Sequence, residues 1–226
     1  MVLSRSGRGF ATAVFGPAAR LLVRLGVSPD VVTVGGTAAV MAVALTLLPT
    51  GHLAVGALVL GALVLADNLD GQMARLLGRS SRWGAFLDST MDRLADAAIF
   101  SGILLWSLRH LDGALGSATT AGALACLVLG GVVPYAKARA EGLGMTANIG
   151  LAERADRLVI VLVATLLVGL GLPAGVMTVA LALLALASAV TVVQRMRTVY
   201  VQSRTTAVPG AAPDATDGPG AGGTAP

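Results

Sequence analysis

Long apolar segments alternate with short polar segments along most of the chain. Six of the apolar segments approach the roughly 20 residues that a helix needs to cross the hydrocarbon core of a bilayer. They cover residues 31–50, 53–76, 84–108, 116–140, 156–172 and 174–198. An open sheet could not satisfy its backbone hydrogen bonds in lipid, whereas helices do so internally. The pattern therefore predicts an all-α protein, a polytopic membrane bundle of six transmembrane helices.

The two ends of the chain differ from these segments. Residues 1–30 mix apolar side chains with several arginines and lack the uninterrupted apolar core of a signal peptide. They predict an amphipathic helix that lies at the membrane surface beside anionic head groups. Residues 201–226 are mostly Ala, Gly, Pro and Thr, a composition that favours disorder. We therefore expect a juxtamembrane segment at 1–30, a transmembrane domain at 31–200 and a cytoplasmic tail at 201–226.

Composition and charge support a membrane protein and predict its orientation. The chain is 55% hydrophobic and only 12% charged, about half the charged fraction of an average soluble domain, which excludes a soluble globular protein. With six spans, all but one of the 16 Lys and Arg residues fall on the side of the two termini, and Arg109 lies on the other. This bias marks the cytoplasmic side of a plasma-membrane protein, so the net charge of +4 does not indicate nucleic-acid binding.

Four aspartates lie near the cytoplasmic ends of two predicted spans, where ionisable residues are rare and usually functional. Asp67 and Asp70 are three residues apart in the second span, and Asp88 and Asp92 are four apart in the third. Either spacing places a pair on one helix face. Because only the short polar loop 76–83 joins the two spans, we expect them to be antiparallel neighbours. The four carboxylates can then converge just inside the membrane.

Converging carboxylates repel one another unless protons or cations neutralise them. Oxygen ligands suit hard divalent ions, and Mg²⁺ commonly bridges carboxylates to substrate phosphates. Gly71, Ala74 and Gly84 lie about one turn from these acids and leave room for a ligand, although small residues also simply allow close helix packing. Arg75 could contact a phosphate. One intramembrane aspartate could merely pair with an arginine, but the complete set predicts a site for metal ions and phosphate.

Read in chain order, these residues form the pattern Asp67-x-x-Asp70-Gly71-x-x-Ala74-Arg75, eight residues, Gly84-x-x-x-Asp88-x-x-x-Asp92. The pattern resembles the signature of the CDP-alcohol phosphotransferases at every position. Those proteins are six-span membrane enzymes, generally homodimers, that transfer a substituted phosphate from a CDP-alcohol to an acceptor hydroxyl and release CMP. The resemblance implies the same architecture here, a homodimer, and two divalent ions, Mg²⁺ or Mn²⁺.

The resemblance also implies a role for each residue of the pattern. The metal ligands would be Asp67, Asp70, Asp88 and Asp92. Asp92 would in addition be the general base that takes the proton of the acceptor. The residues that contact the CDP moiety would be Gly71, Ala74, Arg75 and Gly84, joined by Asp30 and Thr33 from a segment ahead of the first span. An ordinary helix start explains Asp30 and Thr33 equally well.

A second cluster, of basic residues, bears on the acceptor. Lys137, Arg157 and Arg195 lie inside three different spans, where a charge needs a partner, and Arg154 lies close by. A phosphate on the acceptor would be such a partner, although the positive-inside rule also places basic residues at span ends. The surrounding sequence resembles the actinobacterial phosphatidylinositol-phosphate synthases. That resemblance implies CDP-diacylglycerol as the lipid substrate and inositol phosphate, in the 1D-myo-inositol 3-phosphate form, as the acceptor.

Two other functions remain compatible with the sequence. Glycerol 3-phosphate also carries a phosphate, so the basic cluster suits a phosphatidylglycerophosphate synthase as well. Intramembrane carboxylates also serve ion-coupled transporters. Transporters usually place these groups near the bilayer midplane and often contain repeated halves, whereas the acids here lie near one face. Release of CMP that depends on metal separates the enzyme from the transporter.

Overall fold

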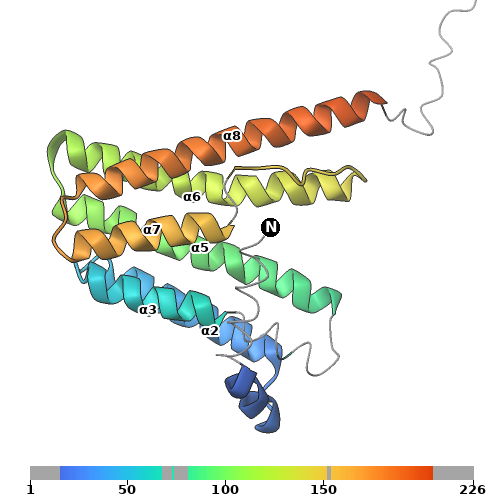
Figure 1. Cartoon of the computed structure of the whole chain (residues 1–226), viewed down its shortest axis with the longest axis horizontal. Coiled ribbons are helices and arrows are strands. Elements are labelled where there is room, and N and C mark those ends of the chain that lie inside the picture. The colour runs from blue at the N-terminus through green and yellow to red at the C-terminus, as the bar shows by residue number, and fades with distance from the viewer. Residues whose placement is uncertain (1–15, 68–72, 74–80, 152–153, 206–226) are drawn as a thin grey trace, which may run out of the picture.

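The computed structural model describes residues 16–67, 73, 81–151 and 154–205 (Figure 1). Six helices are α2 (Pro29–Leu47), α3 (Leu53–Ala66), α5 (Arg82–His110), α6 (Gly113–Gly142), α7 (Arg154–Gly169) and α8 (Gly175–Thr205). Residues 16–24 form a further helical segment, and the described residues contain no strand. The all-α prediction is therefore confirmed, and each of the six helices overlaps one predicted span.

Three of the described helices are long and apolar enough to cross a membrane: α2, α6 and residues 175–204 of α8. The helix α3 is equally apolar but has 14 described residues, because the predicted span 53–76 runs into residues outside the described part. The helices α5 and α7 carry several charged residues in their first halves. The structure thus supports a membrane protein, and the count of six spans stays a prediction.

Local sequence explains where the helices begin and turn. Ser28 caps α2 by accepting a hydrogen bond from the amide of Val31 at 3.3 Å, and Ser81 caps α5 by accepting one from Gly84 at 2.9 Å. At the opposite end of the bundle, tight turns join α2 to α3 and α7 to α8. Both turns contain a glycine with positive φ, Gly51 at 85° and Gly171 at 106°, which other residues rarely adopt.

The helices pack in pairs around an apolar core. In Figure 1, α6 and α8 form one side, α2 and α3 the other, and α5 and α7 lie between them. Leu60, Phe100 and Ile103 are almost completely buried in this core. The backbones of α2 and α5 approach so closely that a Cβ on Gly102 would lie 2.3 Å from the carbonyl oxygen of Ala44. Small residues therefore set this packing, as is usual between membrane helices.

The described parts of the two acidic helices, α3 and α5, come together at their charged ends, where Asp67 meets Asp88 and Asp92. We expected α3 and α5 to be antiparallel neighbours, but α3 packs mainly on α2 and α7, and α5 packs mainly on α2 and α6. The expectation of a packed pair is therefore wrong over the described residues. Close contact at Gly102 draws α5 against α2, and α2 packs on both acidic helices.

Candidate active site

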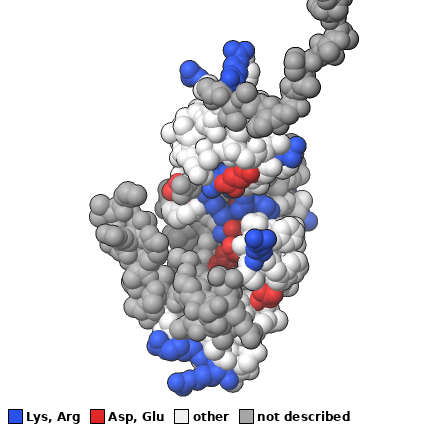
Figure 2. All heavy atoms as spheres, turned by 90° about the vertical axis from the view of Figure 1, so that its right-hand side faces the viewer, with Lys and Arg blue, Asp and Glu red and all other residues white. Residues whose placement is uncertain are grey.

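Charged side chains gather at the end of the bundle opposite the tight turns. Figure 2 looks onto this end, where acidic and basic side chains lie next to one another in the middle of the molecule. The acidic groups come from the end of α3 and the first half of α5. The basic groups beside them come from the start of α7 and from Arg93 of α5, whose Nη2 lies 3.5 Å from Oδ2 of Asp92. Three helices that are separate in sequence therefore build one site.

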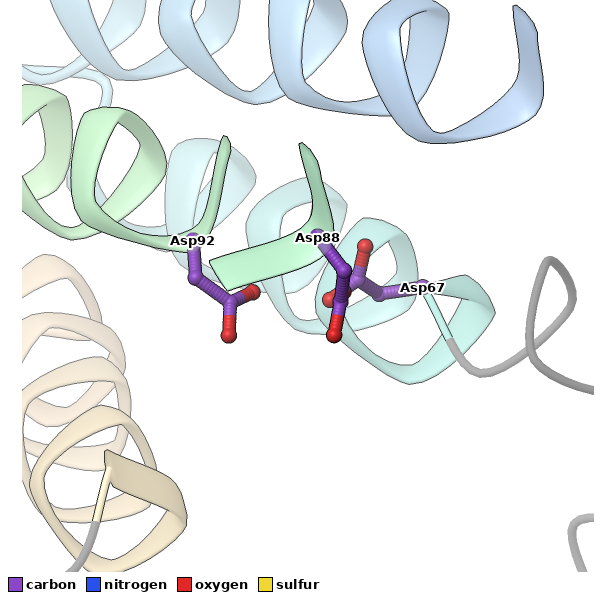
Figure 3. Close-up of side chains that lie close together, drawn as sticks. All are labelled: Asp67, Asp88 and Asp92. Carbon is purple, nitrogen blue, oxygen red and sulfur yellow. The ribbon is translucent and has the colours of Figure 1, made fainter. Parts of the chain in front are cut away.

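Three of the predicted metal ligands converge in this site. Asp67, Asp88 and Asp92 each offer a carboxylate oxygen, and these three oxygens lie within 4.8 Å of one another. Figure 3 shows Asp88 and Asp92 one turn apart on α5, with Asp67 reaching the same space from the end of α3. We call these three residues the acidic triad. The fourth predicted ligand, Asp70, lies outside the described residues.

The acidic triad has the chemistry of a site for a hard divalent cation. Its donors are all carboxylate oxygens, which Mg²⁺ and Mn²⁺ prefer. Asp88 is exposed, whereas Asp67 and Asp92 are half-buried, so an ion here could contact both protein oxygens and a substrate that enters from the open side. The residues present therefore fit the expected metal.

Arg154, at the first residue of α7, lies against the acidic triad. Its Nη1 is 2.8 Å from Oδ1 of Asp92 and 3.5 Å from Oδ2 of Asp67. Its Nε donates a hydrogen bond to Oδ1 of Asp96 at 3.1 Å. The sequence predicts that Arg154 binds the acceptor phosphate, and the structure places its guanidinium group against the acidic triad.

Asp96 is a site residue that the sequence analysis missed. It lies one turn beyond Asp92 on the same face of α5 and is only 3% exposed. Its Oδ2 accepts a hydrogen bond from Nη2 of Arg157 at 3.2 Å, and Arg157 is also 3% exposed. A signal was available in the sequence, because Asp96 is another acidic residue inside a predicted span, at the i+4 position after Asp92.

The other two predicted basic residues have different partners. Lys137 is half-exposed and forms an ion pair of 3.8 Å with Glu141 on its own helix. Arg195 on α8 donates from Nε to the carbonyl of Ile149 at 2.9 Å and from Nη1 to the carbonyl of Val133. The structure therefore joins Arg154 and Arg157 through Asp96, whereas Lys137 and Arg195 make their described contacts elsewhere.

One face of α8 holds the extended segment that leads into α7. The hydroxyl of Thr191 accepts a hydrogen bond from the amide of Leu151 at 3.1 Å. Gln202 accepts one from the amide of Thr146 at 3.0 Å and donates one to its carbonyl at 2.6 Å. With Arg195, these side chains fix the backbone at Thr146, Ile149 and Leu151, which come shortly before α7 in the chain.

The predicted CDP-binding residues are only partly described. Gly71, Ala74 and Arg75 lie outside the described residues. The carboxylate of Asp30 accepts a hydrogen bond from Nε1 of Trp83 at 3.0 Å, which ties the start of α2 to the start of α5. The hydroxyl of Thr33 donates to the carbonyl of Pro29 at 3.1 Å. Gly84 lies in the capped first turn of α5, one turn before Asp88.

A cavity of about 1010 Å³ leads from the acidic triad along the apolar surfaces of α3 and α7. Arg154 and the triad line its charged end, and the remaining lining is aliphatic, including Leu58, Gly61, Leu162 and Val163. The cavity therefore offers a charged end for a polar head and an apolar wall for a hydrocarbon chain. These are the surfaces that an amphiphilic substrate requires.

Comparison with known proteins gives matches across most of the chain. The family model described as CDP-alcohol phosphatidyltransferase matches residues 26–193. The phosphatidylinositol phosphate synthase of Streptomyces avermitilis is 46% identical over 226 residues, which cover 97% of this chain and 91% of that protein. The enzyme of the same name from Mycobacterium tuberculosis is 46% identical over 194 residues, which cover 81% of this chain and 84% of that protein.

Solved structures agree with these sequence matches. The crystal structure of the Mycobacterium tuberculosis phosphatidylinositol phosphate synthase with CDP-DAG bound has a TM-score of 0.79 and 43% identity, covering 83% of this chain and 94% of that one. The structure of the same protein in complex with manganese and citrate has a TM-score of 0.77 and 44% identity, covering 81% of this chain and 88% of that one.

Proposed function

This chain belongs to the CDP-alcohol phosphatidyltransferase family, and from that premise we propose that it is a phosphatidylinositol phosphate synthase. It transfers the phosphatidyl group of CDP-diacylglycerol to a hydroxyl of inositol phosphate, in the 1D-myo-inositol 3-phosphate form, and releases CMP. The observation that carries the proposal is the convergence of Asp67, Asp88 and Asp92 at the charged end of an apolar cavity, beside two arginines.

The acidic triad is the proposed metal site, with Asp70 as a further ligand from the signature. A Mg²⁺ or Mn²⁺ ion bound there supplies positive charge to the diphosphate and to the departing CMP. The relative that was crystallised with manganese supports this choice of ion. Asp30, Thr33, Gly71, Ala74, Arg75 and Gly84 are the proposed contacts of the CDP moiety.

Asp92 is the proposed general base. It lies deeper than Asp88 on the same face of α5, so an acceptor held beyond the diphosphate would present its hydroxyl to Asp92. The acceptor oxygen attacks the phosphorus that carries diacylglycerol, the bond from that phosphorus to the CMP oxygen breaks, and Asp92 takes the hydroxyl proton. No covalent intermediate with the protein is required.

The arginines beside the acidic triad are the proposed sites for the acceptor phosphate. Arg154 and Arg157 enter from α7 within one turn of each other, and Lys137 and Arg195 are the further candidates from α6 and α8. Guanidinium groups suit this task because they form short, charge-assisted hydrogen bonds to phosphate oxygens. An acceptor without a phosphate would leave these cations without a ligand.

The cavity between α3 and α7 is the proposed place for an acyl chain of the lipid substrate. Its aliphatic lining and its charged end match the two parts of CDP-diacylglycerol. We propose that the protein is a multi-pass homodimer of the plasma membrane with its active site and both termini in the cytoplasm. The distribution of Lys and Arg supports this orientation.

The test is CMP release by the purified protein in lipid nanodiscs that contain CDP-diacylglycerol and Mg²⁺ or Mn²⁺. Inositol phosphate, free inositol, glycerol 3-phosphate and serine are offered separately. The proposal expects CMP with inositol phosphate only, and none after EDTA. Release with glycerol 3-phosphate alone would contradict the assigned acceptor and leave the metal site intact. If none of the four acceptors led to CMP release, the proposed reaction would be contradicted.

A further inference from the structure

We propose that Asp96 is a positioning residue of the acceptor site, whose carboxylate holds Arg154 and Arg157 in the orientation that binds the acceptor phosphate. The inference rests on the proposed function, because it takes the two arginines as phosphate ligands. It adds a residue that the aspartate signature does not contain and gives that residue a role different from the roles of the signature aspartates.

The contacts of Asp96 are those of a bridge between two cations. Each of its carboxylate oxygens receives one guanidinium, Nε of Arg154 at 3.1 Å on Oδ1 and Nη2 of Arg157 at 3.2 Å on Oδ2. The group of described acids whose oxygens could share a metal ion comprises Asp67, Asp88 and Asp92 only. The position of Asp96 therefore directs it toward the arginines and away from the metal site.

Arg157 needs this partner and keeps a donor free. It is 3% exposed, and its described ion pair is with Asp96. A guanidinium in such a position is strongly disfavoured without a counter-charge. Its Nε is buried and has no hydrogen-bond partner among the described residues, so the side chain is held in place while part of its hydrogen-bonding capacity is unused. An oxyanion of the acceptor would satisfy that donor.

Arg154 divides its nitrogens between two sets of acids. Nε contacts Asp96, and Nη1 contacts Asp92 and Asp67 of the acidic triad. The bond to Asp96 therefore fixes the guanidinium plane independently of the triad. Arg154, Arg157 and Asp96 together carry a formal charge of +1, and a metal ion bound at the acidic triad would offset the charge of the triad, so an anion beside the arginines would be favoured. Asp96 thus orients both cations without cancelling their attraction for a phosphate.

The test compares Asp96→Asn with the wild-type protein in nanodiscs. Without Asp96 the two arginines are no longer held in place, so the acceptor binds more weakly in the ground state and in the transition state alike. We therefore expect the KM for inositol phosphate to rise at least about tenfold, as for other residues that orient ligand-binding groups. The kcat, the KM for CDP-diacylglycerol and the Kd for Mn²⁺, followed by electron paramagnetic resonance, should stay within about twofold. Asp112→Asn, at the exposed start of α6 at the far end of the bundle, is the matched control and should change none of these.

A double-mutant cycle separates positioning from general stability. If Asp96 acts through Arg157, then adding Asp96→Asn to Arg157→Gln should raise the acceptor KM much less than Asp96→Asn does alone. Equal effects in both backgrounds would overturn the inference. If Asp96→Asn does not fold, Asp96→Glu replaces it, because the longer side chain keeps the charge but moves the carboxylate. An acceptor KM equal to that of the wild type in this variant would also overturn the inference.

The outcomes distinguish the inference from the proposed function. Wild-type protein that releases no CMP with inositol phosphate contradicts the function itself. Wild-type activity together with an unchanged acceptor KM in Asp96→Asn contradicts only the role of Asp96. A fall in kcat with weaker Mn²⁺ binding and an unchanged acceptor KM would instead assign Asp96 to the metal site.

Discussion

The two ends of the bundle hold their helices together by different interactions. At the end with the tight turns, uncharged hydroxyls join the helices, with Ser107 bonded to Thr120 at 3.0 Å and Thr119 bonded to Thr178 at 2.7 Å. At the charged end, the interhelical ion pairs of the described residues run from Arg154 and Arg157 to aspartates. Close packing with a few hydroxyl hydrogen bonds is enough to hold membrane helices together.

This contrast between the two ends indicates where the functional groups of the protein lie. Charges inside a membrane protein are costly to desolvate and persist mainly where a substrate or ion requires them. The end with the tight turns shows that this bundle can be built without buried ion pairs. The charged end therefore carries groups that packing alone does not need, and variants at the two ends should separate activity from stability.

The largest expected effect is at the acidic triad. Asp92→Asn keeps the size of the side chain but removes the proposed base and one metal ligand. We expect kcat to fall by about 10³-fold or more. Asp88→Asn should be similarly inactive but should bind Mn²⁺ more weakly, which electron paramagnetic resonance would measure. Near-normal CMP release by Asp92→Asn would contradict its role as the base.

A smaller effect is expected from the two basic residues that lie apart from Asp96. Lys137→Ala and Arg195→Ala should each raise the KM for inositol phosphate by about tenfold, because each removes a charged hydrogen-bond donor. Arg195→Ala should also lower the melting temperature, since its side chain holds the carbonyls of Ile149 and Val133. Lys137→Ala should leave the melting temperature unchanged, because the exposed ion pair of Lys137 with Glu141 contributes little to stability. An unchanged acceptor KM in both variants would remove them from the pocket.

Narrowing the apolar cavity should affect the lipid substrate only. Gly61 lines the cavity, and a Cβ there would meet no atom within 4 Å. Gly61→Leu should therefore fold and raise the KM for CDP-diacylglycerol by about threefold to tenfold while the acceptor KM stays constant. The control is Gly131→Leu, an equally open site on α6. Equal effects of the two variants would show that the cavity does not bind the lipid.

The smallest effect is expected at the end with the tight turns. Thr119→Val keeps the shape of a completely buried side chain but removes its hydrogen bond to Thr178. We expect a loss of about 0.6 kcal/mol, typical of such bonds between membrane helices, seen as a slightly lower melting temperature in detergent. CMP release should equal that of the wild type. Loss of activity would show that the two ends are coupled.

The amino-acid sequence alone predicts the local features of this protein. Six apolar segments predicted helices where six helices are found, because hydrophobic length is a property of one stretch of chain. The capping serines Ser28 and Ser81, which the structure shows, likewise act within their own first turns. The i+4 spacing of Asp88 and Asp92 placed them on one face of α5 for the same reason. The family signature supplied Asp67, and the structure brings it to the other two.

Contacts between groups that are distant in the sequence depend on how the helices pack. The contact of Gly102 with Ala44 places α2 against α5, so the two acidic helices are not a packed pair. The proposed role of Asp96 depends on its hydrogen bonds with Arg154 and Arg157, which lie about 60 residues further along the chain. No local spacing encodes such a bridge, because it depends on how α7 packs in the bundle and on the segment that α8 holds in front of it. Pairs of side chains on different helices depend on how all the helices pack together, and no single segment determines that packing.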